Sequence, residues 1–419
     1  MIIKTVTGAG YGDEGKGLMT DYFCDKLNDH KVLNIRVNGG AQAGHTVCRL
    51  DKENKQYKHW VFRQYGSGTF AGADTYLASS FMVNFSELLK EYSKLQEIYH
   101  NTSRLYIDKE CRVTLPCDII VNRTLEDHRT KRHGSCGLGI FETFHRNQKI
   151  QSLTVKGLIN KFIDKSIEDF EYYLNQLSQT CIKTRINEIK LTDNIKIDDI
   201  EFAKMKEQAR KMNKEFIDAL VDIIKCEGIE FSESLDKLLQ EKGYNAVVFE
   251  CSQGLELDQY NERNFPHLTP SNTGLIDIIT AIEESKTLQN GEIENCFVTR
   301  SYKTKHGAGE FVEEDIAIQN QFNLYDRTNY RNQYQGQLKY GRLNFGRLKR
   351  LILEQVDKQA SLIEKTGLKQ STALAITHLD QTNECLILNT GIEYYKDIEF
   401  KLFDKVYKSF GEKAVDILD

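Results

Sequence analysis

The amino-acid sequence predicts an α/β fold in which helices flank a large, mostly parallel central sheet. Short apolar, β-branched segments alternate with segments of helical period along most of the chain. Several apolar segments end in a glycine-rich loop, as at residues 1–17, 31–46 and 246–254. Strands that alternate with helices usually pair in parallel, and ligands then bind at the carboxyl ends of the strands.

The first quarter of the chain contains the clearest strand signals. MIIKTVT (1–7) is typical of a buried first strand, and KVLNIRV (31–37) is typical of a second. DTYLASSFMVN (74–84) indicates a further strand and a turn. The amphipathic segment FSELLKEYSKL (85–95) follows and predicts a helix. These elements already follow the order expected for an α/β sheet.

The middle of the chain has a different character. Residues 152–245 are long, charged and helical by period, which predicts a helical subdomain with a solvated face. Strand-like segments return at 246–254, 296–311 and 371–380. The whole chain has only three prolines, so no proline-rich linker divides it. We therefore expect one domain over 1–419.

The composition excludes several classes of protein. With 28% charged residues, 40% hydrophobic residues and a net charge of −5, the chain lacks the basic excess of a nucleic-acid binder. No stretch approaches the roughly 18 apolar residues of a membrane helix. The N-terminus carries one lysine, at position 4, and no cleavage-site pattern. We expect a cytoplasmic protein with no nucleic-acid or membrane partner.

The cysteines also indicate a cytoplasmic protein. Ten cysteines are scattered along the chain and no CxxC motif occurs. This spacing is typical of reduced thiols, and it favours neither a disulfide framework nor a zinc site.

The first glycine loop, GAGYGDEGKG (8–17), predicts a phosphate-binding site. Its glycines let the backbone approach a phosphate, and a helix starting near Gly15 offers free N–H groups. Lys16 supplies a positive charge. The usual P-loop follows this lysine with Ser or Thr, whose hydroxyl binds magnesium, whereas Gly17 follows it here.

An acid pair, Asp13 and Glu14, lies inside this loop. A carboxylate among anion-binding groups is costly unless a cation or a proton-transfer task compensates for it. We therefore predict that Asp13 binds Mg²⁺, acts as a base, or does both. The second loop, GGAQAGHT (39–46), contains His45, which could donate a proton or a hydrogen bond to a phosphoryl oxygen.

Together these two loops resemble the adenylosuccinate synthetase family. GDEGKG after a strand, followed by GGxxAGHT, is the combination that carries the resemblance. Further segments similar to family motifs are FECSQG at 249–254 (family FEGAQG), NFPHLTPSNTG at 264–274 (YPxVTSSNT), HGAGEF at 306–311 (VGxGPF), THLD at 377–380 (TKxD) and SFGE near the C-terminus.

The resemblance implies a fold related to P-loop NTPases and a homodimer. It implies a ligase that joins L-aspartate to C6 of IMP through a 6-phosphoryl intermediate. GTP would be the co-substrate, with one Mg²⁺ in each active site. The partners would then be small molecules: a purine monophosphate, an amino acid and a nucleoside triphosphate.

The resemblance also implies roles for individual residues. Asp13 would coordinate Mg²⁺ and take the N1 proton of the base, the Gly44 carbonyl would add a metal ligand, and His45 would act as an acid on the phosphoryl group. The expected triphosphate-binding residues are Gly12, Asp13, Glu14, Gly15, Lys16, Gly17, His378, Asp380 and Ser409. The expected monophosphate-binding residues are Gln42, Ser135, Cys136, Arg146, Gln253 and Thr269, with Arg146 lent across the dimer.

Several positions depart from the family pattern. His378 replaces the lysine that lies over the guanine base, while Asp380 is expected to pair with guanine N1 and N2 hydrogens and so to favour GTP. Gln42 replaces an asparagine. Cys136 in GSCGLG stands where the family has TTGRGIG, and would substitute weakly for a hydroxyl on the 5′-phosphate.

The largest departure is the amino-acid loop. The family shows TTGRxRRxGW, whereas residues 329–343 read NYRNQYQGQLKYGRL. The remaining cations are Arg331, Lys339 and Arg342. Glutamine does not replace an arginine fork without loss of bidentate carboxylate binding, so the sugar or the amino acid can differ from IMP and aspartate.

Two alternatives therefore stay open. A sister branch of the family makes 2-aminoadenylosuccinate from dGMP, and a ligase acting on dGMP or GMP would suit the altered loop. That branch typically lacks the loop aspartate, yet Asp13 is present. The other alternative is a nucleotide-binding sensor without ligase activity. A pure binder has no need of Asp13 and His45 together with Lys16 and Gln253, which argues against it.

Overall fold

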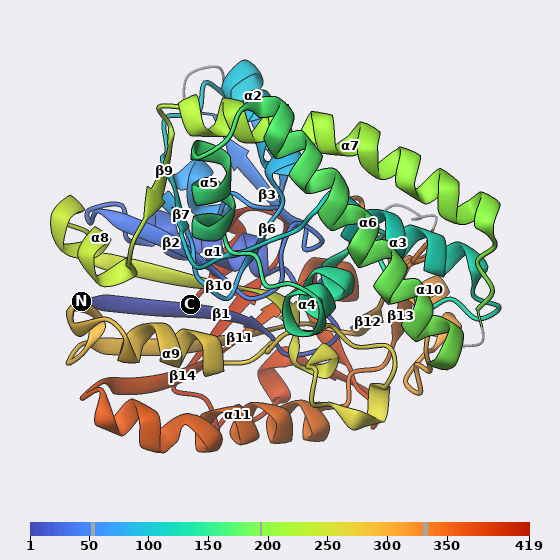
Figure 1. Cartoon of the computed structure of the whole chain (residues 1–419). Coiled ribbons are helices and arrows are strands. Elements are labelled where there is room, and N and C mark those ends of the chain that lie inside the picture. The colour runs from blue at the N-terminus through green and yellow to red at the C-terminus, as the bar shows by residue number, and fades with distance from the viewer. Residues whose placement is uncertain (52–54, 193–194, 330–333) are drawn as a thin grey trace.

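A computed structural model describes residues 1–51, 55–192, 195–329 and 334–419. Its centre is a ten-stranded sheet (Figure 1). Across the sheet the strands are β18 (Ile417–Leu418), β17 (Lys405–Ser409), β14 (Lys369–Thr377), β11 (Glu292–Arg300), β1 (Ile2–Gly8), β10 (Ala246–Gly254), β2 (Val32–Val37), β5 (Asp74–Leu77), β7 (Leu105–Asp108) and β9 (Ile229–Ser232). All neighbours pair in parallel except β17 and β18. The predicted α/β fold with a mostly parallel sheet is confirmed.

Strand β1 lies near the middle of this sheet, and both of its neighbours, β10 and β11, come from much later in the chain. Ile2 is in register with Ala246 of β10 and with Glu292 of β11. At the other end, Gly8 is opposite Gly254 and Val298. The carboxyl ends of three adjacent strands therefore meet at the first glycine loop, where α/β sheets usually bind ligands.

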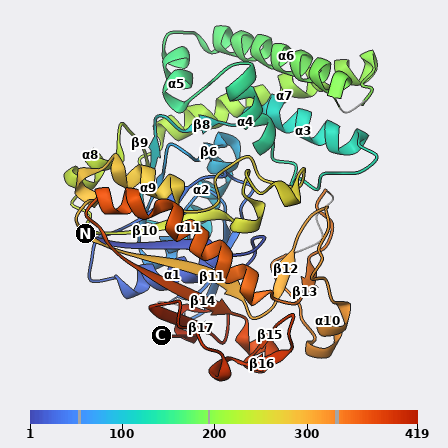
Figure 2. The ribbon, with the colours of Figure 1, turned by 90° about the horizontal axis from the view of Figure 1, so that it is seen from below.

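Helices cover both faces of the sheet. The helices are α1 (Lys16–Lys26), α2 (Phe85–Tyr99), α3 (Pro116–His128), α4 (Ile140–Lys149), α5 (Val155–Ile163), α6 (Ile167–Thr192), α7 (Asp199–Lys225), α8 (Leu235–Lys242), α9 (Ile276–Glu283), α10 (Ile316–Phe322) and α11 (Phe345–Lys365). Figure 2 shows α9 and α11 lying across one face. Their residues Ile279 and Ile352 share a core with Phe297 of β11, whereas Met19 of α1 packs with Val298 in the core of the opposite face. This cover on both faces explains why β2 and β10 are buried along almost their whole length.

The long helices α6 and α7 pack together beside α3 and α2, at the end of the sheet that carries β7 and β9 (Figure 1). Phe170, Leu174, Phe216 and Leu220 lie in their shared core. Strand β9 falls inside the segment 152–245, yet it pairs with β7 in the central sheet. The division into one domain with a helical subdomain stays a prediction. Within the described ranges, no helix combines the length and apolar character needed to cross a membrane.

Four two-stranded sheets complete the fold. They are β3 (His45–Leu50) with β4 (Tyr57–Phe62), β6 (Met82–Val83) with β8 (Arg112–Val113), β12 (Lys303–Lys305) with β13 (Lys339–Gly341), and β15 (Cys385–Ile387) with β16 (Ile392–Tyr394). The hairpin of β3 and β4 begins at His45, inside the second glycine loop (39–46).

Candidate active site

The first glycine loop forms a cradle for an anion, and Glu14 fills it. Gly15 caps helix α1 in the left-handed conformation, with φ 94°. The backbone N–H groups of Gly10 and Gly12 donate to Oε1 of Glu14 at 2.9 and 2.7 Å. The ammonium of Lys16 donates to Oε2 at 3.0 Å. These donors are the ones that a phosphate would use, so the side chain of Glu14 occupies a phosphate-like position.

Gly17 brings the second loop against the first. A Cβ at this position would lie 2.6 Å from the carbonyl oxygen of Thr46 and 3.2 Å from the Cβ of His45. Only glycine therefore allows this contact between helix α1 and the start of β3. The same contact explains why the hydroxyl residue of an ordinary P-loop is absent here.

The side chain of Asp13 faces His306. Its Oδ2 lies 3.0 Å from Nδ1 of His306, and its backbone carbonyl accepts a hydrogen bond of 2.5 Å from Nε of Arg300. Burial raises the pKa of Asp13, but His306, Arg300 and Lys16 together lower it below its ordinary value. The carboxyl is therefore ionised at neutral pH. Asp13 itself has a left-handed backbone, with φ 61°.

His45 is held by a buried carboxylate. Its Nδ1 lies 2.5 Å from Oε1 of Glu250, and its Nε2 lies 3.3 Å from the carbonyl of Ser252. Glu250 also accepts from the backbone N–H of Ser67 at 3.0 Å and lies 3.5 Å from the guanidinium of Arg36. All of these side chains are buried.

The charges of this pair follow from their surroundings. Burial raises the pKa of Glu250, but Arg36 and the hydrogen bonds from His45 and Ser67 outweigh it and lower the value to about 2. Burial and Arg36 lower the pKa of His45, against the opposing effect of Glu250. Glu250 is therefore ionised and His45 neutral at pH 7, so Nδ1–H of the imidazole donates to the carboxylate.

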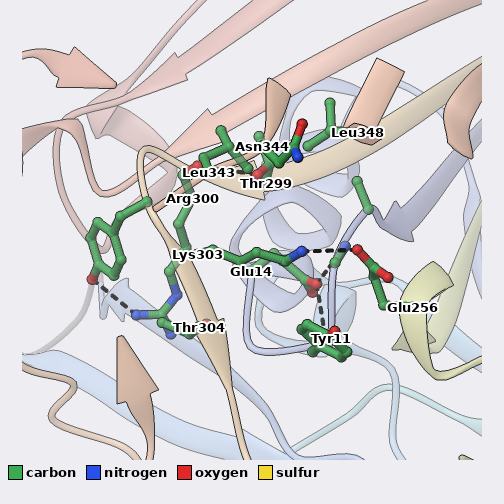
Figure 3. A pocket seen from close by; sticks show the side chains of 14 residues that line it. Tyr11, Glu14, Glu256, Thr299, Arg300, Lys303, Thr304, Leu343, Asn344 and Leu348 are labelled. Atoms are coloured by element: carbon green, nitrogen blue, oxygen red, sulfur yellow. Dashed lines mark hydrogen bonds and ion pairs between the residues drawn. The ribbon is translucent and has the colours of Figure 1, made fainter. Parts of the chain in front are cut away.

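A pocket lies between the first glycine loop and the end of β11 (Figure 3). The wall of the pocket includes Tyr11, Glu14, Glu256, Arg300 and Lys303. The Lys303 ammonium lies 2.9 Å from Glu256, so this wall of the pocket carries buried, paired charges.

Strand β14 brings the predicted base-reading residues to the same loop. The hydroxyl of Thr377 donates to the Glu14 carbonyl at 2.8 Å. His378 follows with φ 62°, and burial lowers its pKa well below the ordinary value, so its ring is neutral. Asp380 is exposed to solvent. The protein around its carboxyl still removes some of the surrounding water, and this desolvation, together with the negative charges of Asp416 and Glu412, raises its pKa. Ser409 is buried and donates to the Gly411 carbonyl at 2.7 Å.

Some predicted monophosphate residues have free hydrogen-bonding capacity. Both amide atoms of Gln42 are buried without a partner among the described residues. Gln253 lies beside Gly12, where a Cβ would be 3.6 Å from its Oε1. These positions fit a polar ligand next to the glycine loop.

Others are occupied by contacts within the chain. Ser135 hydrogen-bonds Asn122 at 3.0 Å, and Thr269 lies 3.4 Å from the Ser271 hydroxyl. Cys136 is partly buried, and burial raises its pKa, so it is a thiol and not a thiolate.

The structure places Arg146 away from any surface. Its guanidinium donates to Asp118 at 2.9 Å and to the carbonyls of Val113 and Gln151 at 2.5 and 3.1 Å, and the side chain is 2% exposed. The expectation that this arginine reaches a partner subunit therefore does not fit the structure. Its buried carboxylate partner fixes it inside its own chain.

The predicted amino-acid-binding cations are also paired. Arg342 donates to Asp315 at 2.7 Å, and Lys339 lies 3.5 Å from Glu314. Arg331 lies outside the described residues. In the described part of this loop, the structure thus shows no arginine fork that could bind a carboxylate as the family motif does.

Sequence reasoning missed four residues of the site. Glu250 and Arg36 are charged residues inside apolar strand segments, AVVFECSQG and KVLNIRV, and this pattern is a signal that could have identified them. His306 and Arg300 lie far from Asp13 in the sequence, and only the fold brings them together.

Comparisons with known proteins identify the family. A profile described as adenylosuccinate synthetase matches residues 5–410. The chain is 29% identical over 317 residues to the adenylosuccinate synthetase of Lactobacillus acidophilus, covering 75% of this chain and 65% of the relative. It is 27% identical over 319 residues to that of Neurospora crassa, covering 74% and 64%. The matched part thus spans slightly less than two thirds of these relatives' length.

Two solved structures share the fold. Fully ligated adenylosuccinate synthetase from Plasmodium falciparum superimposes with a TM-score of 0.64 at 17% identity, covering 100% of this chain and 99% of that one. Succinoaminodeoxyadenylate synthetase of cyanophage S-2L, bound to dGMP and to dATP as an energy donor, gives 0.59 at 13% identity, covering 100% and 95%. With the profile match over nearly the whole length, the chain belongs to the adenylosuccinate synthetase family.

Proposed function

We propose that this chain is a GTP- and Mg²⁺-dependent ligase that joins L-aspartate to C6 of IMP through a 6-phosphoryl intermediate. We further propose that it works as a homodimer in the cytoplasm. The observation that carries the proposal is the convergence of three groups on one glycine loop. They are the anion cradle with Lys16, the ionised Asp13, and His45 held by Glu250.

The cradle suits the phosphates of a nucleoside triphosphate. Its N–H donors and the Lys16 ammonium already bind one carboxylate, that of Glu14. A phosphate carries more charge and more acceptor oxygens than a carboxylate, so it can displace Glu14 from the same donors. Transfer of a phosphoryl group then depends mainly on positioning and on charge neutralisation.

Asp13 and Gly44 fit a magnesium ion chemically. The Asp13 carboxylate is ionised, and the Gly44 carbonyl, next to His45, is a second hard oxygen donor of the kind that Mg²⁺ prefers. The ion, when bound, would neutralise charge on the phosphate oxygens. Asp13 would in addition accept the N1 proton of the purine, because its carboxylate is ionised at neutral pH.

His45 would exchange a proton with the transferred phosphoryl group through Nε2. Glu250 holds Nδ1, so it fixes the tautomer and the orientation of the ring. The carboxylate also favours the imidazolium whenever Nε2 gains a proton. Nε2 carries no proton in this tautomer, so it must gain one before it can donate to a phosphoryl oxygen.

A second candidate substrate follows from the amino-acid loop. Arg342 and Lys339 are paired with Asp315 and Glu314, so a carboxylate or a ribose hydroxyl must compete with these acids for them. His306 also contacts Asp13 at the position where the family motif has valine. Both features favour a changed monophosphate, and a ligase that acts on dGMP or GMP is the alternative.

The test is a substrate matrix scored by product mass. IMP, GMP, dIMP and dGMP are each offered with aspartate, and with other amino acids, under GTP or ATP and Mg²⁺. Succinylated IMP supports the first proposal, and a product only from GMP or dGMP supports the second. Nucleotide binding without any product would contradict both and leave a sensor.

Two variants test the assigned roles. Asp13→Ala and His45→Ala should each abolish ligation in a folded protein, whereas Asp164→Asn, at an exposed position after α5, should keep full activity. Turnover like that of the unmodified chain in either active-site variant would contradict the roles.

A further inference from the structure

Three possible metal ligands converge away from the glycine loop. Cys48 on β3 and His59 on β4 are paired across the hairpin, so their side chains lie on the same face. Sγ of Cys48 lies 3.2 Å from Nε2 of His59. Glu412 joins them from the C-terminal segment, because its neighbour Lys413 forms a parallel bridge with Cys48. The sulfur, a ring nitrogen and a carboxylate oxygen all lie within 4.8 Å of one another.

We propose that Cys48, His59 and Glu412 form a binding site for one Zn²⁺ ion. Tetrahedral zinc with ordinary bond lengths holds a sulfur and a nitrogen ligand about 3.6 Å apart. The 3.2 Å between Sγ and Nε2 therefore needs only a small separation to admit the ion. Glu412 is exposed, so its carboxylate can move the remaining distance at little cost.

The ligand set selects the kind of metal. A thiolate with an imidazole and a carboxylate suits zinc and related transition metals, whereas Mg²⁺ prefers oxygen alone. Three protein ligands leave a fourth position for water or another small ligand. This site is thus chemically distinct from the Asp13 and Gly44 oxygens.

The surroundings of Cys48 keep it protonated when no metal is bound. Burial and Glu412 raise the pKa of Cys48 to about 12, so without a metal it is a thiol that can donate to His59. Lys413 opposes this shift, but its ammonium lies 4.1 Å from the centre of the Tyr57 ring, which holds it there by a cation–π contact. A cysteine binds metal as the thiolate, so metal binding at Cys48 would release the thiol proton, which is measurable.

The position of the site suggests what the ion does. Strand β3 begins at His45, and Ser409 ends strand β17 just before Glu412. An ion on these ligands would fasten the hairpin that carries His45 to the C-terminal segment. The ligands come from opposite ends of the chain and form no CxxC motif, which is why the cysteine spacing gave no sign of zinc.

The test uses Co²⁺ as a spectroscopic probe on the full chain after treatment with a chelator. We expect one Co²⁺ per chain, a thiolate-to-cobalt charge-transfer band, release of a proton on binding, and loss of the band when Zn²⁺ is added. Cys48→Ser should abolish the band. Cys385→Ser, which changes a partly exposed thiol on β15, is the matched control and should keep it.

Two further variants keep the test valid if Cys48→Ser unfolds the chain. His59 and Glu412 are exposed, so His59→Ala and Glu412→Gln should fold normally. Each should weaken Co²⁺ binding at least about tenfold. Zn²⁺ should raise the melting temperature of the unmodified chain and not of these variants. Cobalt binding without a thiolate band, or binding unchanged in His59→Ala, would overturn the proposal.

Discussion

Replacing Glu250 by glutamine should destabilise the chain strongly. The Glu250 carboxylate is completely buried and lies beside the equally buried guanidinium of Arg36. Glutamine keeps the shape and can still accept a hydrogen bond from Ser67. It removes the charge, however, and leaves Arg36 without a carboxylate partner. Removing one member of a buried ion pair typically costs about 3–5 kcal/mol.

The pKa of Glu250 gives a second route to the magnitude. Its value falls from the ordinary 4.5 to about 2 in the folded chain. At about 1.4 kcal/mol for each pH unit, this shift corresponds to about 3 kcal/mol of folding free energy at neutral pH. Solvent screening does not reduce this free energy, because the carboxylate is fully buried. For a chain of 419 residues, 3 kcal/mol corresponds to a fall of about 3–4 °C in melting temperature.

The pH dependence has a definite sign. A carboxylate whose pKa is lowered by folding stabilises fully above its unfolded pKa and loses this contribution as pH falls through the folded value. The difference in melting temperature between the unmodified chain and Glu250→Gln should therefore be constant above about pH 5. It should shrink as the pH falls from 4.5 towards 2.

The assay is thermal unfolding followed by circular dichroism from pH 7 to pH 3. Glu241→Gln is the control, because this glutamate is exposed and its ion pair with Lys237 is worth less than about 1 kcal/mol. A difference for Glu250→Gln no larger than the control, or one that does not shrink below pH 4.5, would refute the reasoning.

Three other outcomes are expected. Gly17→Ala should abolish triphosphate binding measured by calorimetry, because its Cβ would meet the backbone of β3 at 2.6 Å. The control Gly346→Ala, in helix α11, should leave binding intact. Equal affinities of the two variants would contradict the close contact at Gly17. Glu14→Ala empties the anion cradle, so inorganic pyrophosphate should bind about tenfold more tightly, and weaker binding would argue against displacement of Glu14. Asp380→Asn should move nucleotide preference from GTP towards ATP in the ligation assay, and an unchanged preference would exclude the base-reading role.

The parts of the fold that local sequence determines were predictable. The strand, glycine loop and helix at residues 2–26 follow from β-branched residues, glycines and a capping position that lie next to one another. The pairing of β1 with β10 and β11 was not predictable in detail. Register in a sheet depends on strands that are far apart in the sequence.

The site divides in the same way. Asp13, Lys16 and His45 lie within two short motifs, so their residue types and spacing were enough to single them out. His306 contacts Asp13 only because β11 and β12 deliver it there. The role given to Arg146 came from the family resemblance, and nothing in the local sequence shows that Asp118 pairs with it in the interior.

The order of strands across the sheet has a consequence for how the chain is made. Strand β1 is synthesised long before its neighbours β10 and β11, which end at Gly254 and Arg300. Strand β1 therefore has no neighbour in the sheet until β10 has been synthesised. Pairings between such distant segments form slowly, and an unpaired apolar strand invites aggregation. We expect nascent chains truncated before residue 254 to depend on chaperones, and the phosphate cradle to form only after β10 and β11 have been synthesised.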